Sequence, residues 1–151
     1  MVDVFKKAVR SRIMRAVRVT ETEPENRLAD ALRQSGLRFQ RNDRRVPGRP
    51  DICFRRSRLA VFVDGDFWHG RAWFDRGEAP ATNAAFWIRK FEINHRRDRT
   101  VDRQLRASGW SVLRLWGSEI RKTPDEAVKQ IRARLRRLAR EHRPRGAKRS
   151  A

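Results

Sequence analysis

Residues 47–70 constrain the fold of this chain more than any other stretch, because they place two short apolar runs next to each other. The first run covers residues 52–54, the second covers residues 59–63, and a polar, mostly basic link of four residues joins them. Runs of this kind, rich in Val, Phe and Ile and bounded by polar turns, predict two β-strands paired as a hairpin. The mainly apolar second run also predicts a strand that is covered on both faces.

Acidic side chains stand at the ends of both predicted strands. Asp51 comes directly before the first strand, and Asp64, Asp66 and His69 follow the second. In an antiparallel pair the start of one strand lies beside the end of the other, so Asp51 and Asp64 are expected to converge at one edge of the sheet. Crowded carboxylates repel one another unless a cation lies between them. A hard divalent ion with oxygen ligands, Mg²⁺, is the ion that this group predicts.

The charge balance predicts a polyanionic partner. The chain has 151 residues, and 38 Lys and Arg against 18 Asp and Glu give a formal net charge of +20. Nucleic acid is the partner that such a positive surface favours most, although basic proteins also bind membranes and ribosomes. The length predicts one folded domain with a single core.

Cysteine usage and hydropathy indicate the compartment. Cys53 is the single cysteine and lies inside an apolar run, so no disulfide can form within the chain and no thiolate zinc site can be built. No apolar stretch is long enough to span a bilayer, and the first residues lack the apolar segment of a signal peptide. We therefore expect a soluble protein of the cytoplasm without membrane contact.

The N-terminal part predicts a basic arm and then a helix. Residues 1–20 are expected to form a basic arm or helix, with an ordered helix and an arm that orders on DNA both open. Thr22 followed by Glu25 has the form of a capping box, and the helix should end at Gly36. Glu25 also lies on the apolar stripe of Leu28 and Leu32. It is thus either a cap alone or a carboxylate that faces the metal site.

The rest of the chain predicts an α/β domain over residues 21–141, with a central mixed β-sheet flanked by helices, and a disordered basic tail over residues 142–151. The expected elements are a strand near 37–40, an irregular loop over 71–81, a long helix capped by Asn83 and running to Leu105, a strand over 110–116 broken by Gly117, and a last helix started by the capping box Thr123 to Glu126.

Several motifs occur together in the order and spacing of a known family. They are MRAV at 14–17, TETEPE at 20–25, VPGRPD at 46–51, VFVDGDFWHG at 61–70, PATN with FW within 80–87, K-x-x-x-N at 90–94, RD at 97–98 and GW-x-V-L at 109–113. Over roughly residues 8–135 the chain resembles the very-short-patch repair endonucleases (Vsr). The resemblance implies a restriction-endonuclease-like fold and a monomeric enzyme that uses Mg²⁺ to nick one DNA strand beside a T:G mismatch left by deamination of 5-methylcytosine, with other mismatch-repair proteins as possible partners.

The resemblance also implies roles for the acidic edge. Asp51 and the main-chain carbonyl of Val63 would bind the metal, and His69 would be the general base. Glu25 and Asp98 would hold metal-bound waters. Asp64 stands where some relatives have histidine, and it either adds a metal ligand or changes the metal preference. From the residues alone, Asp51 could instead be a turn residue and His69 a surface imidazole, although an ordinary pKa near 6.5 suits a base.

DNA recognition is implied for a second group. The aromatic residues Phe67, Trp68 and Trp87 match the family's wedge, which pries open a weakly paired step. Core packing is the alternative for each ring. Lys90 and Asn94 match the pair that reads the exposed base edges, and in the arm Met14 matches the residue that enters the other groove, with Arg15 beside it as a further DNA contact.

The chain differs from the family at the positions that bind a structural zinc ion in the relatives. In this chain those positions are occupied by Asp66, Arg71 or Trp73, and Gly117, so we expect no zinc. The loop at 65–75 should be held by packing of Trp73 and Phe74 or by ion pairs. Two other functions stay open, namely a restriction or homing-type nuclease for unmodified duplex DNA and a DNA-binding module without catalysis.

Overall fold

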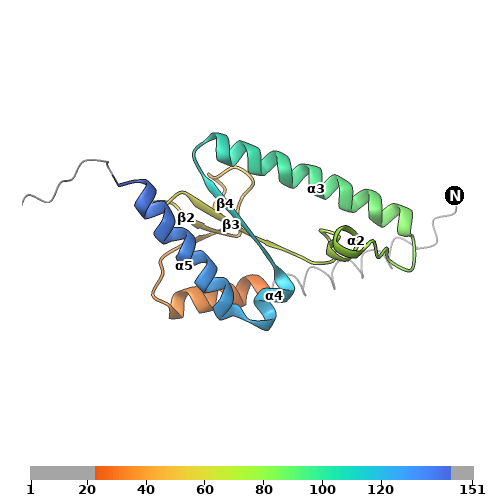
Figure 1. Ribbon diagram of the computed structural model, residues 1–151, viewed down its shortest axis with the longest axis horizontal. Helices are drawn as coiled ribbons and strands as arrows, with labels where there is room; N and C mark the ends of the chain where they lie inside the picture. The colour runs from red at the N-terminus through yellow and green to blue at the C-terminus, as the bar shows by residue number, and fades with distance from the viewer. Residues whose placement is uncertain (1–22, 144–151) are drawn as a thin grey trace, which may run out of the picture.

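The computed structural model describes residues 23–143, in which one sheet lies between two layers of helices (Figure 1). Four strands follow one another in the order β1 (Gln40–Arg41), β2 (Ile52–Phe54), β3 (Leu59–Asp64) and β4 (Ser111–Trp116). The first three are antiparallel neighbours, whereas β4 runs parallel to β3. The predicted hairpin is confirmed, with β2 paired to β3. Because β4 runs parallel to β3, both strands end at the same edge of the sheet.

Helices cover both faces of this sheet. The long helix α3 (Ala84–Ala107) lies along one face, and the helix at 23–34 lies with α4 (Gly117–Lys122) and α5 (Pro124–Glu141) on the other (Figure 1). The short helix α2 (Arg71–Arg76) packs against α3, since the ring of Phe74 lies 4.9 Å from that of His95. The predicted α/β class, with a mixed sheet flanked by helices, is confirmed, and it is that of the restriction-endonuclease-like fold.

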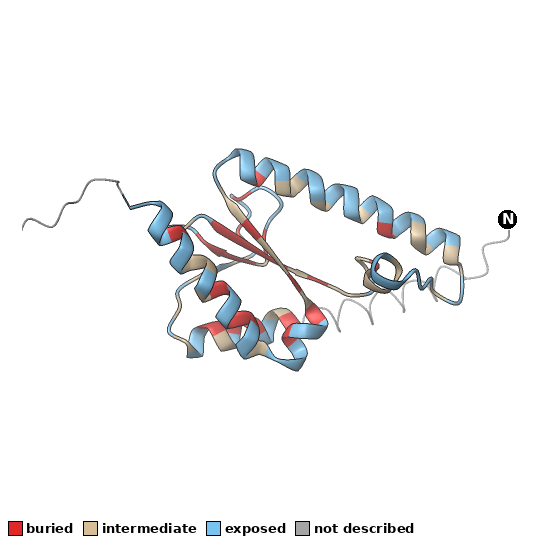
Figure 2. Cartoon of the chain, viewed as in Figure 1, coloured by how far each residue is buried: buried red, intermediate tan, exposed pale blue. Residues whose placement is uncertain are grey.

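The core divides according to the alternation of side chains along β3. Leu59 and Val61 face the helix at 23–34 and α5, whereas Ala60 and Phe62 face α3. Figure 2 shows the buried residues along the central strands and along one stripe of α5. Val128, Ile131 and Leu138 of α5 are buried and form this stripe.

The structure corrects two expectations, for the loop at 71–81 and the strand near 37–40, and it adds one helix that was not predicted. The segment 71–81 is not irregular throughout, because α2 forms over its first six residues and ends at Gly77 in the left-handed conformation. Gly117 does end β4, but it also begins α4, which the sequence pattern did not predict. The strand near 37–40 is reduced to the two residues of β1, because its pairing with β2 extends only over Gln40 and Arg41.

The predicted helix caps form only in part. The helix at 23–34 ends before Gly36, which has a positive φ of 75° as expected. Asn83 and Thr123 do occupy the N-cap positions of α3 and α5, but neither side chain makes a capping hydrogen bond. Asn83 is left-handed, a conformation that asparagine tolerates, and the Thr123 carbonyl instead accepts the Glu126 N–H at 3.1 Å. Thr22 lies outside the described residues.

The chain ends are only partly covered by the structure. The last helix ends at Glu141, whereas the predicted arm at 1–20 and the tail from 144 onward lie outside the described residues. Within the part of the chain that the structure describes, none of the helices has the length and apolar character that a membrane crossing requires.

Candidate active site

The hairpin places Asp51 beside the end of β3. Ile52 is paired with Val61, so Asp51 lies one step further along, next to the last residues of β3. Its Oδ2 accepts a hydrogen bond of 2.7 Å from the backbone N–H of Val63. The carboxylate of Asp51 and the main chain of Val63 are therefore fixed to each other by the register of the hairpin.

A second carboxyl group meets Asp51 from the helix at 23–34. The side chain of Glu25 is hydrogen-bonded to that of Asp51, which shows that Glu25 faces the sheet edge. Burial raises the pKa of Asp51, and the hydrogen bonds from Val63 and Glu25 and the charges of Arg114 and His69 oppose that rise. Two carboxyl groups in contact can hold one proton between them, and a divalent cation in that place would neutralise both. The donor set at this edge therefore fits a hard metal ion with oxygen ligands.

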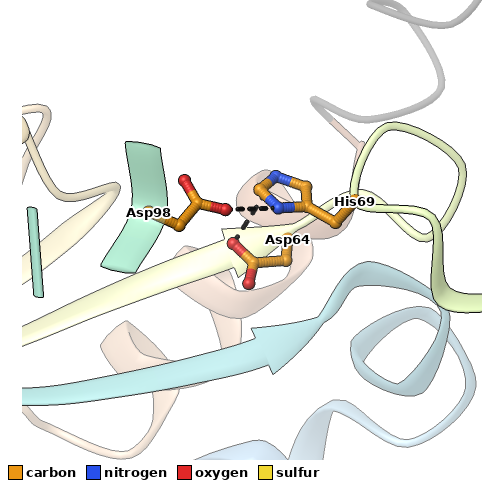
Figure 3. A group of neighbouring side chains, drawn as sticks. All are labelled: Asp64, His69 and Asp98. Atoms are coloured by element: carbon orange, nitrogen blue, oxygen red, sulfur yellow. Dashed lines mark ion pairs between the residues drawn. The ribbon is translucent and has the colours of Figure 1, made fainter. Parts of the chain in front are cut away.

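A second acidic group surrounds His69 on the α3 face of the sheet. Asp64 comes from the end of β3, His69 from the turn after it, and Asp98 from the middle of α3, and both carboxylates point toward the imidazole ring (Figure 3). His69 Nδ1 lies 2.7 Å from Asp98 Oδ2, and its Nε2 lies 3.7 Å from Asp64 Oδ1. Ligand atoms of all three lie within 4.8 Å of one another, so this group too has the spacing of a metal site.

The two carboxylates beside His69 have different environments. Burial raises the pKa of Asp64 although His69 and Arg114 oppose it. Burial also disfavours the charge of Asp98, but the hydrogen bond to His69 and the positive charges of His69, Arg114 and Arg97 together outweigh burial and lower the pKa of Asp98. For His69, burial favours the neutral ring, yet the bond to Asp98 and the charges of Asp64 and Asp98 raise its pKa. An imidazole whose Nδ1–H donates to Asp98 keeps Nε2 as the atom that can take a proton.

Arg114 belongs to this site and was not predicted from the sequence. It lies in the middle of β4, and its Nη1 donates to Asp64 Oδ1 at 2.9 Å. Its Nε and Nη2 donate to Asp102 of α3 at 3.1 and 2.7 Å, and Nη1 lies 3.8 Å from Asp98 Oδ1. An arginine inside a predicted core strand is a signal that acidic partners lie nearby, since a buried charge needs them. Any metal contact of Asp64 is expected through its other oxygen, Oδ2.

Ion pairs hold the loop that follows the site. Asp66 accepts hydrogen bonds from Ser118 N, Ser118 Oγ and Arg71 Nη1, and Arg71 Nη2 donates to Glu119 at 2.8 Å. The guanidinium of Arg71 also lies over the ring of Trp116, 5.0 Å from its centroid. These contacts join the start of α2 to the start of α4, which agrees with the ion-pair alternative for the loop at 65–75. We call Asp66, Arg71, Ser118 and Glu119 the loop latch. Its side chains include neither the thiolates nor the imidazoles that typically hold structural zinc, and the expectation that this chain binds no zinc stays a prediction.

The predicted wedge residues form one aromatic cluster. The ring of Phe67 lies 5.8 Å from that of Trp68 and 4.9 Å from that of Trp87, and the two tryptophan rings are 5.7 Å apart. Phe91, which is buried, closes the inner side at 5.8 Å from Phe67. Phe67 itself is 39% exposed. The cluster is thus packed on one side and open on the other, so core packing alone does not account for it.

The other predicted DNA contacts differ in their environment. Lys90 is exposed, with its Nζ 5.8 Å from the centroid of the Phe86 ring. Asn94 Nδ2 donates a hydrogen bond of 2.9 Å to the carbonyl of Trp68, so it supports the loop that holds the aromatic cluster. Met14 and Arg15 lie outside the described residues. The predicted roles of all these side chains in DNA binding and catalysis stay predictions.

Comparison with known proteins identifies the family of this chain. A model of the family described as DNA mismatch endonuclease Vsr matches residues 2–75. The chain is 42% identical over 110 residues to a type II nicking enzyme, V.HpaIIP, of Haemophilus parainfluenzae, with 73% of this chain and 78% of the relative covered. It is 40% identical over 131 residues to the DNA mismatch endonuclease Vsr of Escherichia coli K12, covering 85% and 83%. A type II nicking enzyme of Neisseria meningitidis, V.NmeDIP, is 39% identical over 127 residues, covering 84% and 86%.

The fold, the carboxylate site at the sheet edge and these relatives define an endodeoxyribonuclease that nicks DNA. Nucleases of this kind use a divalent metal ion, for which the acidic edge is suited. The chain belongs to the DNA mismatch endonuclease Vsr family.

Proposed function

We propose that this protein is a Mg²⁺-dependent endonuclease that nicks one strand of duplex DNA beside a T:G mismatch, as in very-short-patch repair. The observation that carries the proposal is the position of the His69–Asp98 pair directly beside an open aromatic cluster, with Asp51 and Glu25 at the same sheet edge. A proton acceptor, a cation site and a group that can separate bases thus lie together. The T:G preference follows the resemblance and the printed name of the Escherichia coli relative.

The metal would be held by Asp51 and the main-chain carbonyl of Val63, with Asp64 as a further ligand and Glu25 and Asp98 near its waters. When bound, Mg²⁺ would offset the charge that develops on the phosphate during hydrolysis. His69 would take a proton from the attacking water at Nε2 while Asp98 holds the Nδ1–H. The water oxygen forms a bond to phosphorus, one P–O ester bond breaks, and the leaving oxygen receives a proton.

The aromatic cluster would separate the mispaired step. Inserting rings into a base step costs a few kcal/mol, and the cost is lowest at a mispair because a mispair stacks and pairs less firmly than a correct pair. Phe67, Trp68 and Trp87 would supply the wedge, Lys90 and Asn94 would contact base edges, and Met14 and Arg15 would enter from the other groove. The protein would act as a cytoplasmic monomer on the bacterial nucleoid, together with other mismatch-repair proteins.

A specific observation favours a second candidate. Several relatives are named type II nicking enzymes, among them the Haemophilus parainfluenzae and Neisseria meningitidis proteins. This supports an endonuclease that nicks at a recognition sequence and requires only part of the wedge. It would keep Asp51, His69 and the metal and lose the dependence on a mispair.

The test is nicking of end-labelled duplexes that carry each mispair, with a fully paired duplex of the same sequence as the control and with Mg²⁺ present or chelated. The proposal expects one strand of the T:G duplex to be cut only with the metal present. Equal cutting of the paired duplex would favour the second candidate. Binding of DNA without any cutting would instead leave a non-catalytic module.

A further inference from the structure

Arg114 has contacts that the roles assigned to the metal, the base and the wedge do not explain. Its guanidinium lies between β4 and α3, where it donates to Asp64 at 2.9 Å and to Asp102 at 2.7 Å. Asp98 Oδ1 lies 3.8 Å from the same Nη1. The guanidinium also stacks on the ring of Phe62, with the Arg114 Cζ 4.3 Å from the ring centroid.

Two of these three carboxylates are the neighbours of His69. Asp98 Oδ2 is 2.7 Å from His69 Nδ1, and Asp64 Oδ1 is 3.7 Å from His69 Nε2. Asp64 and Asp98 come from different elements, and like charges so close together would drive them apart in the absence of a cation. Arg114 supplies that cation from the protein itself, and its planar fork fixes direction as well as charge.

Asp102 completes the arrangement without touching the imidazole. It lies one turn after Asp98 on α3 and accepts hydrogen bonds from both Nε and Nη2 of Arg114. Arg114 is therefore anchored by Asp102 on one side. On the other side its Nη1 faces Asp64 and Asp98, the two carboxylates beside His69.

We propose that Arg114, anchored by Asp102, is a positioning residue for the nicking reaction, because it fixes Asp64 and Asp98 around the His69 imidazole. The inference rests on the proposed function, in which His69 takes the proton. Arg114 also occupies the side of Asp64 and Asp98 that a further cation would otherwise take. Without Arg114, a divalent ion from solution gains access to this group.

The test compares Arg114→Ala, Arg114→Lys and Asp102→Asn with wild type on the duplex that wild type cuts best. Misplacement of a catalytic group by about 1 Å costs roughly 100-fold in rate. We expect kcat to fall about 100-fold in Arg114→Ala and about tenfold in each of the two milder variants, with KM for DNA unchanged. The nicking rate of Arg114→Ala should also continue to rise at Mg²⁺ concentrations that saturate wild type.

Arg134→Ala is the matched control. Arg134, on α5, is also a partly buried arginine that contacts β4, with its Nη1 donating to Ser111 Oγ at 2.9 Å. Its contacts lie at the other end of that strand from the His69 site. An equal loss of kcat in Arg134→Ala, or a higher KM with kcat unchanged, would overturn the inference. The same holds if the Mg²⁺ dependence of Arg114→Ala matches that of wild type.

A second readout needs no turnover. The ¹⁵N NMR signals of the His69 imidazole, assigned with His69→Gln, report its tautomer and hydrogen bonding. We expect them to shift in Arg114→Ala and to stay unchanged in Arg134→Ala. If wild type cuts no duplex, the proposed function fails, whereas the NMR comparison still decides whether Arg114 positions the imidazole.

Discussion

The two faces of the sheet differ in what they bury. The face toward the helix at 23–34, α4 and α5 is apolar except where Glu25 meets Asp51 at the sheet edge, and Leu32, Leu59 and Ile131 are fully buried there. The face toward α3 is apolar only near Phe62 and Leu105, and from there it continues as the charged group of Asp64, Arg114 and Asp98. One strand, β3, supplies residues to both.

This difference indicates a division of labour within one small sheet. Burial of apolar area on the first face stabilises the fold, whereas the second face accepts the desolvation cost of carboxylates, which raises the pKa of Asp64. Substitutions on the two faces should therefore separate stability from activity, and the following predictions test that separation.

Asp51→Asn should produce the largest effect. Loss of a metal-binding charge removes several kcal/mol of transition-state stabilisation, so nicking should fall by about 1,000-fold or more in single-turnover assays. Because burial raises the pKa of Asp51, the folded state binds more protons than the unfolded chain above pH 3.8. The carboxylate thus lowers stability at neutral pH, and Asn should raise the melting temperature there in metal-free buffer. A variant that is both inactive and less stable would contradict this.

Ile131→Ala should have the opposite profile. Ile131 is fully buried in α5, and removing its side chain from a packed core costs about 2–5 kcal/mol of unfolding free energy. Below the melting transition its kcat should stay close to that of wild type. Urea unfolding measures the free energy of unfolding, and nicking assays at low temperature measure kcat. Lys129→Ala, at an exposed position of the same helix, is the control. A selective fall in kcat would mean that the apolar face also shapes the site.

Gly70→Ala should affect both properties. Gly70 follows His69 with a φ of 62°, and an added Cβ would lie 2.6 Å from the Phe91 ring. The strain and the clash together should cost about 1–3 kcal/mol and reduce nicking about tenfold. Gly77→Ala is the control, because Gly77 has a similar φ of 68° with nothing within 4 Å. Equal effects in the two variants would show that backbone strain alone is responsible.

The loop latch should have the smallest effect, and that effect should depend on pH. Burial opposes the charge of Asp66, but hydrogen bonds from Ser118 and Arg71 outweigh it and lower its pKa below 3.8. The stabilisation of the folded state by ionised Asp66 is therefore complete above pH 3.8, and it is lost as the pH falls through the lower pKa of the folded state. Because the pair is partly exposed, it is worth at most about 1 kcal/mol. Melting curves of wild type and Asp66→Asn should differ at pH 6 and converge in strong acid.

The sequence alone predicted the hairpin and the convergence of Asp51 with the end of β3, because strand pairing follows directly from two apolar runs and a short link. It also indicated, through the helical stripe of Leu28 and Leu32, that Glu25 could face the site. In contrast, the contact between His69 and Asp98 joins residues of a turn and a distant helix. Local periodicity carries no information about such a pair, and the family resemblance implied a role for each residue without predicting their contact.

Other parts of the site depend on tertiary contacts. Arg114 was read as one position in an alternating strand, since the sequence does not show that Asp102 and Asp64 lie on either side of it. Asn94 was predicted to read bases, yet its amide donates to the Trp68 carbonyl. Helix α2 was missed because Gly77 and Pro80 dominate the local pattern, although the contact of Phe74 with His95 supports a helix there.

The order of two neighbouring residues has a consequence for where the DNA is cut. Trp68, a ring of the aromatic cluster, is joined by one peptide bond to His69, and consecutive Cα atoms are about 3.8 Å apart. Under the proposed function, the chain itself then measures the offset between the opened base step and the hydrolysed ester. That offset cannot drift from one substrate to another, so every cut should fall at the same register relative to the mispair.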